Sequence, residues 1–163
     1  MHIMKVTVKT RDAVSVYNIL RGVNLVKTDA PTRKAVLRAC RQLRPAAEDF
    51  KAFSEDAVER LKPEGWDKVL ASLKSKTATD EEKAAARRAV RRMEAEYQRS
   101  VDDCVREELE REETVEIPEP FTFEMIDGLI GASESLGADA VMLLEDVLME
   151  RSENDKEEKG GGE

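Results

Sequence analysis

Two pairs of adjacent arginines, Arg87-Arg88 and Arg91-Arg92, have the residue type and spacing that best suit binding chemistry in this sequence. Residues four positions apart share one side of a helix, so the four guanidinium groups would lie together. Guanidinium groups bind carboxylates or phosphates through paired hydrogen bonds. The pattern therefore predicts either a helix that binds nucleic acid or a helix whose arginines pair with carboxylates of the same chain. We favour the second interpretation, because the net charge is −8 and aromatic residues make up only 4% of the chain.

Groups that could support catalysis or bind a metal are sparse. Cys40 and Cys104 lie 64 positions apart, without the C-x2-C spacing of a zinc site. The single histidine, His2, stands at the start of the chain, where we expect it to provide no base for a cysteine nucleophile. The acidic pairs 102–103 and 145–146 have no histidine at ligand spacing, and we interpret them as solvated helix faces. We expect no enzyme activity, no metal, no cofactor and no small-molecule substrate.

Three aromatic residues are candidates for a contact surface, although packing in the core is the more common role at each. Trp66 follows Pro63-Glu64-Gly65, where we expect the first long helix to end, while Phe121 and Phe123 follow two prolines. The full set of candidate interaction residues is Trp66, Phe121, Phe123, Arg87, Arg88, Arg91 and Arg92.

The composition predicts that helices position these residues. Charged residues make up 38% of the 163 residues and hydrophobic residues 40%, with only eight glycines and five prolines. This balance is typical of long, solvated helices and excludes disulfide scaffolds and collagen-like chains. No apolar run approaches the roughly 18 residues that a membrane span needs, so we expect no membrane contact. The predicted fold class is mainly α: a long antiparallel helical hairpin with a small α+β subdomain.

Two long helices give the strongest periodic signals. The first begins near Pro31 and continues past Pro45, where we expect a kink. The second begins with a capping box, Thr79 followed by Glu82, and runs to about residue 113. The first helix carries a coiled-coil-like seam in steps of four and three, namely Val36, Cys40, Leu43, Ala47, Phe50, Ser54, Ala57 and Leu61.

The N- and C-terminal segments supply the remaining elements. Alternation predicts strands at 5–9 and 114–117, and apolar spacing predicts helices at about 10–21, 124–130 and 138–149. A short helix at 66–73 would structure the tip of the hairpin. We expect one domain over 1–151, with a hairpin at about 31–113, an end subdomain of 4–30 plus 114–151, and a disordered acidic and glycine-rich tail at 152–163.

Charge is unevenly distributed along the chain. Residues 1–44 contain ten basic and two acidic residues, whereas 102–163 contain five basic and twenty-one acidic ones. An antiparallel hairpin would place the basic start of the first long helix beside the acidic end of the second. The register that achieves this puts Cys40 next to Cys104 and Ala47 near Tyr97. It also sets four carboxylates against four arginines, namely Glu48, Asp49, Glu55 and Asp56 against Arg88, Arg91, Arg92 and Arg99.

Three segments resemble small phage and prophage proteins of unknown function from Gram-positive hosts. They are V-Y-N-I-L-R-G-V-N-L, then A-P-T-R-K-A-V-L-R-A-C-R-Q-L, and later E-I-P-E-P-F-T-F-E-M-I-D-G-L-I. Asn18, Gly22, Thr32 and Arg33 match the pattern, whereas Pro45 and the tryptophan segment depart from it. Because such proteins are often encoded near tail and lysis genes, the resemblance implies an accessory or assembly role. It implies no catalytic residues.

Three functions are compatible with these observations. The first is a non-enzymatic, phage-derived accessory protein that acts through a protein partner or a homo-oligomer, in virion or tail assembly. The second is an inhibitor of a host defence or regulatory protein, in which the acidic segment 107–119 mimics nucleic acid. The third is a nucleic-acid-binding protein that uses 33–44 and 87–92. The first residues lack the apolar core of a signal peptide, so we expect a cytoplasmic protein, in the host cytoplasm if phage-encoded.

Overall fold

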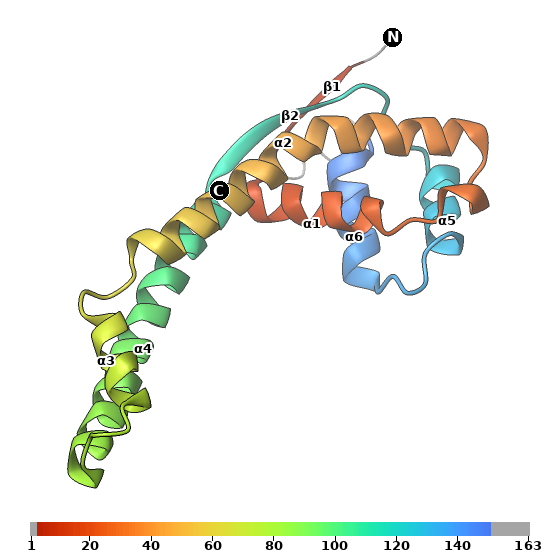
Figure 1. Cartoon of the computed structure of the whole chain (residues 1–163). Coiled ribbons are helices and arrows are strands. Elements are labelled where there is room, and N and C mark those ends of the chain that lie inside the picture. The colour runs from red at the N-terminus through yellow and green to blue at the C-terminus, as the bar shows by residue number, and fades with distance from the viewer. Residues whose placement is uncertain (1–2, 151–163) are drawn as a thin grey trace. The chain divides into compact units, whose positions relative to one another are not determined.

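The structure, a computed structural model of the chain, describes residues 3–150. It is mainly α-helical with a small two-stranded sheet, and this confirms the predicted fold class. His2 and the expected tail at 152–163 lie outside the described residues. In chain order the elements are β1 (Met4–Lys9), α1 (Thr10–Arg21), a 3-10 turn η1 (Leu25–Lys27), α2 (Ala30–Arg60), α3 (Trp66–Lys74), α4 (Asp80–Glu110), β2 (Glu112–Ile117), α5 (Phe123–Gly131) and α6 (Ala138–Leu148) (Figure 1).

The described residues form two compact units. The end unit contains the residues up to Phe50 and those from Glu110 onward, and the hairpin unit contains Lys51–Leu109. The end unit is larger than the end subdomain that we predicted, because it includes α2 up to Phe50. Burial explains the difference, since Val36 and Leu43 of α2 are at most 1% exposed and belong to the same core as the strands.

The sheet of the end unit joins the first and last parts of the chain. β1 and β2 pair antiparallel, with Met4 opposite Ile117 and Val6 opposite Val115. Strand residues alternate between the two faces of a sheet. Accordingly Val8, Val115 and Ile117 are buried, while their neighbours along each strand are more exposed. The predicted α+β subdomain built from both ends of the chain is therefore confirmed.

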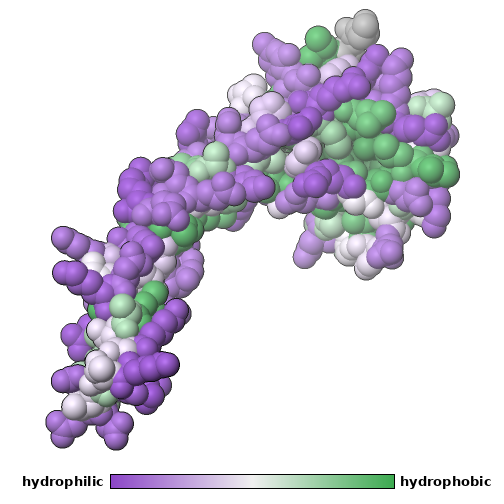
Figure 2. All heavy atoms as spheres, viewed as in Figure 1, coloured by the Kyte–Doolittle hydropathy of each residue, from purple (hydrophilic) through white to green (hydrophobic). Residues whose placement is uncertain are grey.

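Three helices and the start of α2 complete the core of the end unit. On α1 the buried residues Ala13, Val16 and Leu20 recur three and four positions apart, as an amphipathic helix requires. Helix α6 packs against both α1 and α5. Helix α5 approaches α2 closely at Gly128, where a Cβ atom would lie 3.9 Å from Thr32 Cγ2. Figure 2 shows that apolar residues reach the surface over this unit.

Helix α2 begins at a capped end and runs through its internal proline. Asp29 Oδ1 accepts a hydrogen bond from the Thr32 backbone N–H at 2.8 Å, and hydrogen bonds from Thr32 lower the pKa of Asp29. The helix continues as one element through Pro45. All eight positions of the predicted seam are buried or half-buried. The seam prediction is therefore confirmed, because its periodicity tracks the side of α2 that faces other parts of the protein.

Opposite charges from the two ends of the chain meet in the end unit. Lys9 Nζ and Arg11 Nη1 donate to the two carboxylate oxygens of Glu110, at 2.7 and 2.8 Å. This contact lowers the pKa of Glu110, chiefly through the hydrogen bond from Lys9. Two further ion pairs of the same kind are Lys5 with Glu116 at 4.0 Å and Arg38 with Glu119 at 3.6 Å.

The hairpin unit contains the end of α2, then α3 and α4. The predicted capping box of α4 is confirmed, since the Thr79 N–H donates to Glu82 Oε2 and the Glu82 N–H donates to Thr79 Oγ1, each at 3.2 Å. Helix α3 follows Gly65, whose φ of 82° lies in the left-handed region that favours glycine. Within the described part of this unit, only Ala57 is fully buried, so packing is thinner than in the end unit.

The register predicted for the hairpin is wrong. The Tyr97 hydroxyl donates to the carbonyl of Val58, and the Tyr97 ring lies 6.1 Å from the Trp66 ring. Val58 lies about three helical turns beyond Ala47, the residue that we expected beside Tyr97. The reason is that α3 lies alongside α4 and extends the first arm (Figure 1), so the chain turns at residues 75–79.

The conformation at Gly65 can be tested by substitution. We expect Gly65→Ala to lower the free energy of unfolding by about 1 kcal/mol, because a Cβ disfavours a positive φ. No atom lies within 4 Å of the Cβ position, so the cost would come from the backbone alone. Gly65→Asn should cost less. Gly131→Ala is the control, since this helical glycine has a negative φ and the same open surroundings, and it should be neutral or stabilising. Urea denaturation followed by circular dichroism measures all three variants.

The ion pairs at Glu110 predict a pH-dependent contribution to stability. Because the folded-state pKa of Glu110 lies below the ordinary value of 4.5, its contribution is present above that pH. It is lost as the pH falls through the lowered folded-state pKa. We therefore expect Glu110→Gln to lower the Tm at pH 7 and to match the wild type in strong acid. Glu64→Gln removes an exposed carboxylate without an ion pair among the described residues, and it should show no such trend. An equal Tm difference at every pH would contradict this prediction.

Candidate functional site

The two candidate phenylalanines have opposite environments. Phe121 is 3% exposed in the core of the end unit, and its backbone N–H donates to the Leu148 carbonyl at 2.8 Å. Its proposed role as a contact residue is therefore wrong, because the chain leaving β2 turns it inward. Phe123 is 69% exposed and begins α5, with the exposed Ile130 seven positions later on the same side of the helix.

Trp66 has a structural role in the hairpin unit. It is half-buried at the start of α3 and packs against Tyr97, which is itself hydrogen-bonded to Val58. The three residues thus link α2, α3 and α4. These contacts leave Trp66 half-buried, whereas an anchor residue for a partner would be exposed.

The four candidate arginines lie together on the solvent side of α4. The opposite side of this helix carries the half-buried residues Ala86, Val90, Met93 and Tyr97. The four arginines are all exposed, and we call them the arginine face: Arg87, Arg88, Arg91 and Arg92. Their spacing covers about two turns of helix, so one partner segment can contact them all.

The prediction that carboxylates of the same chain occupy these arginines is wrong. Among the described residues, the arginine face forms no ion pair and no hydrogen bond through its side chains. Two of the predicted partners are paired within their own helix, Glu48 with Arg44 at 2.8 Å and Asp56 with Arg60 at 3.6 Å. Residues four apart on one helix can pair without any particular register between helices.

The arginines at the start of α2 behave differently. Arg33 Nε donates to the Leu25 carbonyl at 3.0 Å and Arg33 Nη2 donates to the Thr28 carbonyl at 2.9 Å. Arg38 pairs with Glu119. These side chains stabilise the end unit, whereas those of the arginine face form no hydrogen bond or ion pair with the rest of residues 3–150.

Electrostatics also favour an external anion at the arginine face. Arg87 and Arg91 are four residues apart, as are Arg88 and Arg92, and like charges at this spacing destabilise a helix by a few tenths of a kcal/mol per pair. A carboxylate or phosphate placed between them would remove this repulsion and accept several charge-assisted hydrogen bonds. The face is therefore suited to bind an anionic group.

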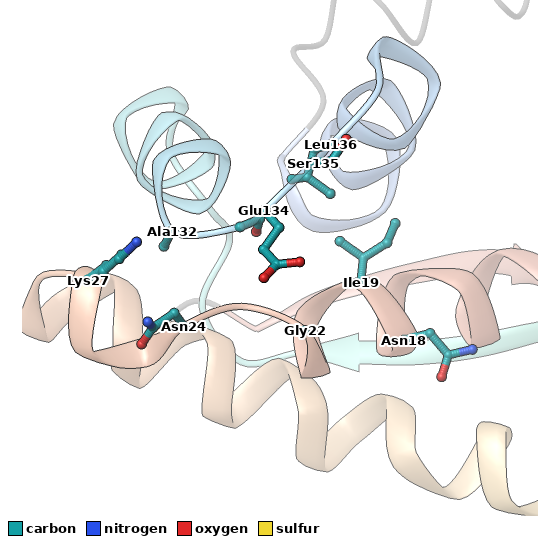
Figure 3. Close-up of a pocket in the computed structure, with 10 residues that line it drawn as sticks. Asn18, Ile19, Gly22, Asn24, Lys27, Ala132, Glu134, Ser135 and Leu136 are labelled. Carbon is teal, nitrogen blue, oxygen red and sulfur yellow. The ribbon is translucent and has the colours of Figure 1, made fainter.

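An open pocket in the end unit is a feature that sequence reasoning missed. It has a volume of about 580 Å³ and lies between the end of α1 with η1 and the loop after α5 (Figure 3). Figure 3 shows Lys27 and Glu134 on different sides of it, with Ile19 and Leu136 among the apolar lining. The glycines around 131–137 predict a loose connection, but no residue pattern signals a cavity there. The lining also contains the hydroxyl groups of Ser133 and Ser135, and Ser133 Oγ donates to the Leu129 carbonyl at 2.7 Å.

The two cysteines, Cys40 in the end unit and Cys104 in the hairpin unit, are both free thiols. Burial raises the pKa of the Cys40 thiol, so less of it is present as the nucleophilic thiolate.

Over residues 3–150, no cluster of three histidine, cysteine or acidic side chains is arranged to hold a metal. No helix in the same range is long and apolar enough to cross a membrane.

Neither a protein-family model, nor a curated protein, nor a solved structure matches this chain. The resemblance to small phage proteins therefore stays a hypothesis, and the arginine face is the candidate site with the most specific structural support.

Alanine substitutions can separate binding arginines from structural ones. We expect Arg88→Ala/Arg92→Ala to change the free energy of unfolding by less than about 0.5 kcal/mol, because no contact is lost and alanine favours helix. Arg33→Ala should cost about 1 kcal/mol or more, because it removes hydrogen bonds to two backbone carbonyls. Urea titrations measure both values. A large loss of stability in the Arg88/Arg92 variant would assign that pair a structural role.

Proposed function

We propose that this chain is a non-catalytic binding protein whose arginine face binds an acidic surface of a partner protein. The observation that carries the proposal is the set of four exposed arginines on α4 that have no partner among the described residues. Other basic side chains of the described residues do form ion pairs, within a helix, across the sheet, or between α2 and the segment after β2. The arginine face is left with its full capacity to bind carboxylates.

A protein partner fits this face better than a nucleic acid does. Along α4 the exposed residues change from basic to acidic, since Asp102 and Asp103 follow three turns after the arginines. A phosphate backbone that extended past the arginines in this direction would meet those carboxylates. Strong nucleic-acid binding needs neutralisation of several successive phosphates. A short acidic segment of a protein needs only the two turns that the arginines occupy.

The acidic segment at 107–119 gives less support to mimicry of nucleic acid. Glu110 is held by Lys9 and Arg11, Glu116 lies near Lys5, and Glu119 pairs with Arg38. These contacts neutralise part of the charge that a mimic would have to present. The resemblance to phage proteins adds virion or tail assembly as the setting for the proposed binding, and the proposal for the arginine face does not depend on that setting.

Binding of an acidic peptide tests the proposal. A fluorescent oligoglutamate peptide is titrated with the full chain at low salt and followed by anisotropy. We expect saturable binding that weakens about tenfold in Arg88→Ala/Arg92→Ala and weakens further as salt screens the charges. The matched control is Lys34→Ala/Arg41→Ala, which removes the same charge from exposed, unpaired positions of α2 and should leave binding unchanged.

Two results would overturn this function. The first is the absence of saturable peptide binding, or binding that the Arg88/Arg92 variant does not weaken. The second is tighter binding of a DNA duplex than of the peptide under the same salt conditions, with the same dependence on Arg88 and Arg92. That second result would assign the face to nucleic acid instead.

A further inference from the structure

We propose that one acidic partner of the arginine face is a second copy of this chain, bound through antiparallel pairing of two α4 helices. The arginines at 91–92 of each copy would then face the carboxylates at 102–103 of the other copy. This inference rests on the proposed function, because it requires that the arginine face bind carboxylates. It adds the identity of the partner and the segment that binds.

The exposed side of α4 carries both of the complementary charges. Arg91 and Asp102 lie eleven residues apart, which is close to three turns, so they lie on one flank of that side. Arg92 and Asp103 have the same spacing and lie on the other flank. All four residues are exposed in the hairpin unit. The small, exposed Ala95 lies between the flanks and permits a close approach of a second helix.

A twofold axis perpendicular to the two helices makes these charges meet. With such an axis the two helices run in opposite directions, and each flank of one helix lies beside the same flank of the other. Each contact between the copies therefore occurs twice. With the axis near residue 97, Arg91 lies opposite Asp102 of the second copy and Arg92 lies opposite Asp103. Arg99 and Glu96, which are also exposed, oppose each other in the same register.

The carboxylates have capacity left for this pairing. Asp102 Oδ1 accepts one hydrogen bond from Gln98 at 2.8 Å, and Asp103 Oδ1 lies 3.5 Å from Arg106 Nη1. Each group keeps its second oxygen, and a carboxylate accepts several hydrogen bonds. A parallel arrangement would instead place arginine against arginine and aspartate against aspartate. The charge order along α4 therefore selects the antiparallel pair.

The pairing should be weak and sensitive to salt. Exposed ion pairs contribute little individually, and Arg88 would face Arg106 of the second copy, which opposes association. The interface offers no large apolar residue at its centre. We expect a dimer that dissociates on dilution and whose dissociation constant rises about tenfold or more between low and high salt.

Charge exchange tests the pairing directly. Sedimentation equilibrium of the full chain measures the wild type, Arg91→Glu/Arg92→Glu and Asp102→Arg/Asp103→Arg. Each double variant alone should weaken self-association about tenfold or more, because both members of every principal pair then carry the same charge and repel each other. An equimolar mixture of the two variants restores every opposite-charge contact and should associate about as strongly as the wild type. Lys34→Glu/Arg41→Glu is the control and should behave as the wild type, and circular dichroism establishes that each variant is folded.

The outcomes separate this inference from the proposed function. A wild-type chain that stays monomeric, yet binds oligoglutamate through Arg88 and Arg92, overturns self-pairing and leaves the proposed function intact. Absence of both activities overturns both. A dimer that persists in the two double variants, or a mixture that fails to recover association, overturns the α4 pairing. Excess oligoglutamate should also dissociate the wild-type dimer, since the peptide and the second copy would use the same arginines.

Discussion

The end unit depends on the antiparallel ladder between β1 and β2, closed at one end by Glu110. Lys9 and Arg11 both donate to this carboxylate, so the end of α4 is tied to the point where β1 passes into α1. Each exposed ion pair contributes little, but the ladder holds Val8, Val115 and Ile117 in the core. Because it joins the two ends of the chain, the sheet must form before the core of the end unit can be complete.

The same ladder determines which charges remain available. The first residues of the chain are basic, and their carboxylate partners lie at 110–119. Carboxylates of α2 in turn pair with arginines of their own helix. Both arrangements follow from proximity, which a helix, the strand pair or the packing of α2 beside the segment after β2 provides. The arginine face forms no such pair among the described residues, although Glu94 and Glu96 lie three and four positions after Arg91 and Arg92 on the same helix.

Local patterns in the sequence predict the elements but not the register between them. The alternation in β1, the capping box of α4 and the seam of α2 each depend on residues within a few positions of one another, and all three are confirmed. The hairpin register depends on where the chain turns. Pro63 to Gly65 interrupts the first arm without reversing it, and α3 extends that arm. A break and a turn share the same residue types, so the sequence alone does not distinguish them. For the same reason the spacing of the arginines predicts their common face, whereas their lack of partners follows only from the structure.

Most of the packing that stabilises the fold lies in the end unit, whereas the arginine face lies in the hairpin unit. Nearly all fully buried residues belong to the end unit, and the hairpin unit has thin packing around Ala57 and the Trp66–Tyr97 contact. Phe121 belongs to the core of the end unit, whereas Phe123 and Ile130 of the same unit are exposed. On α4 the side chains of the arginine face form no hydrogen bond or ion pair among the described residues. Charges there can be arranged for a partner at little cost to the fold, and this helix can therefore acquire a binding function without disturbing the core.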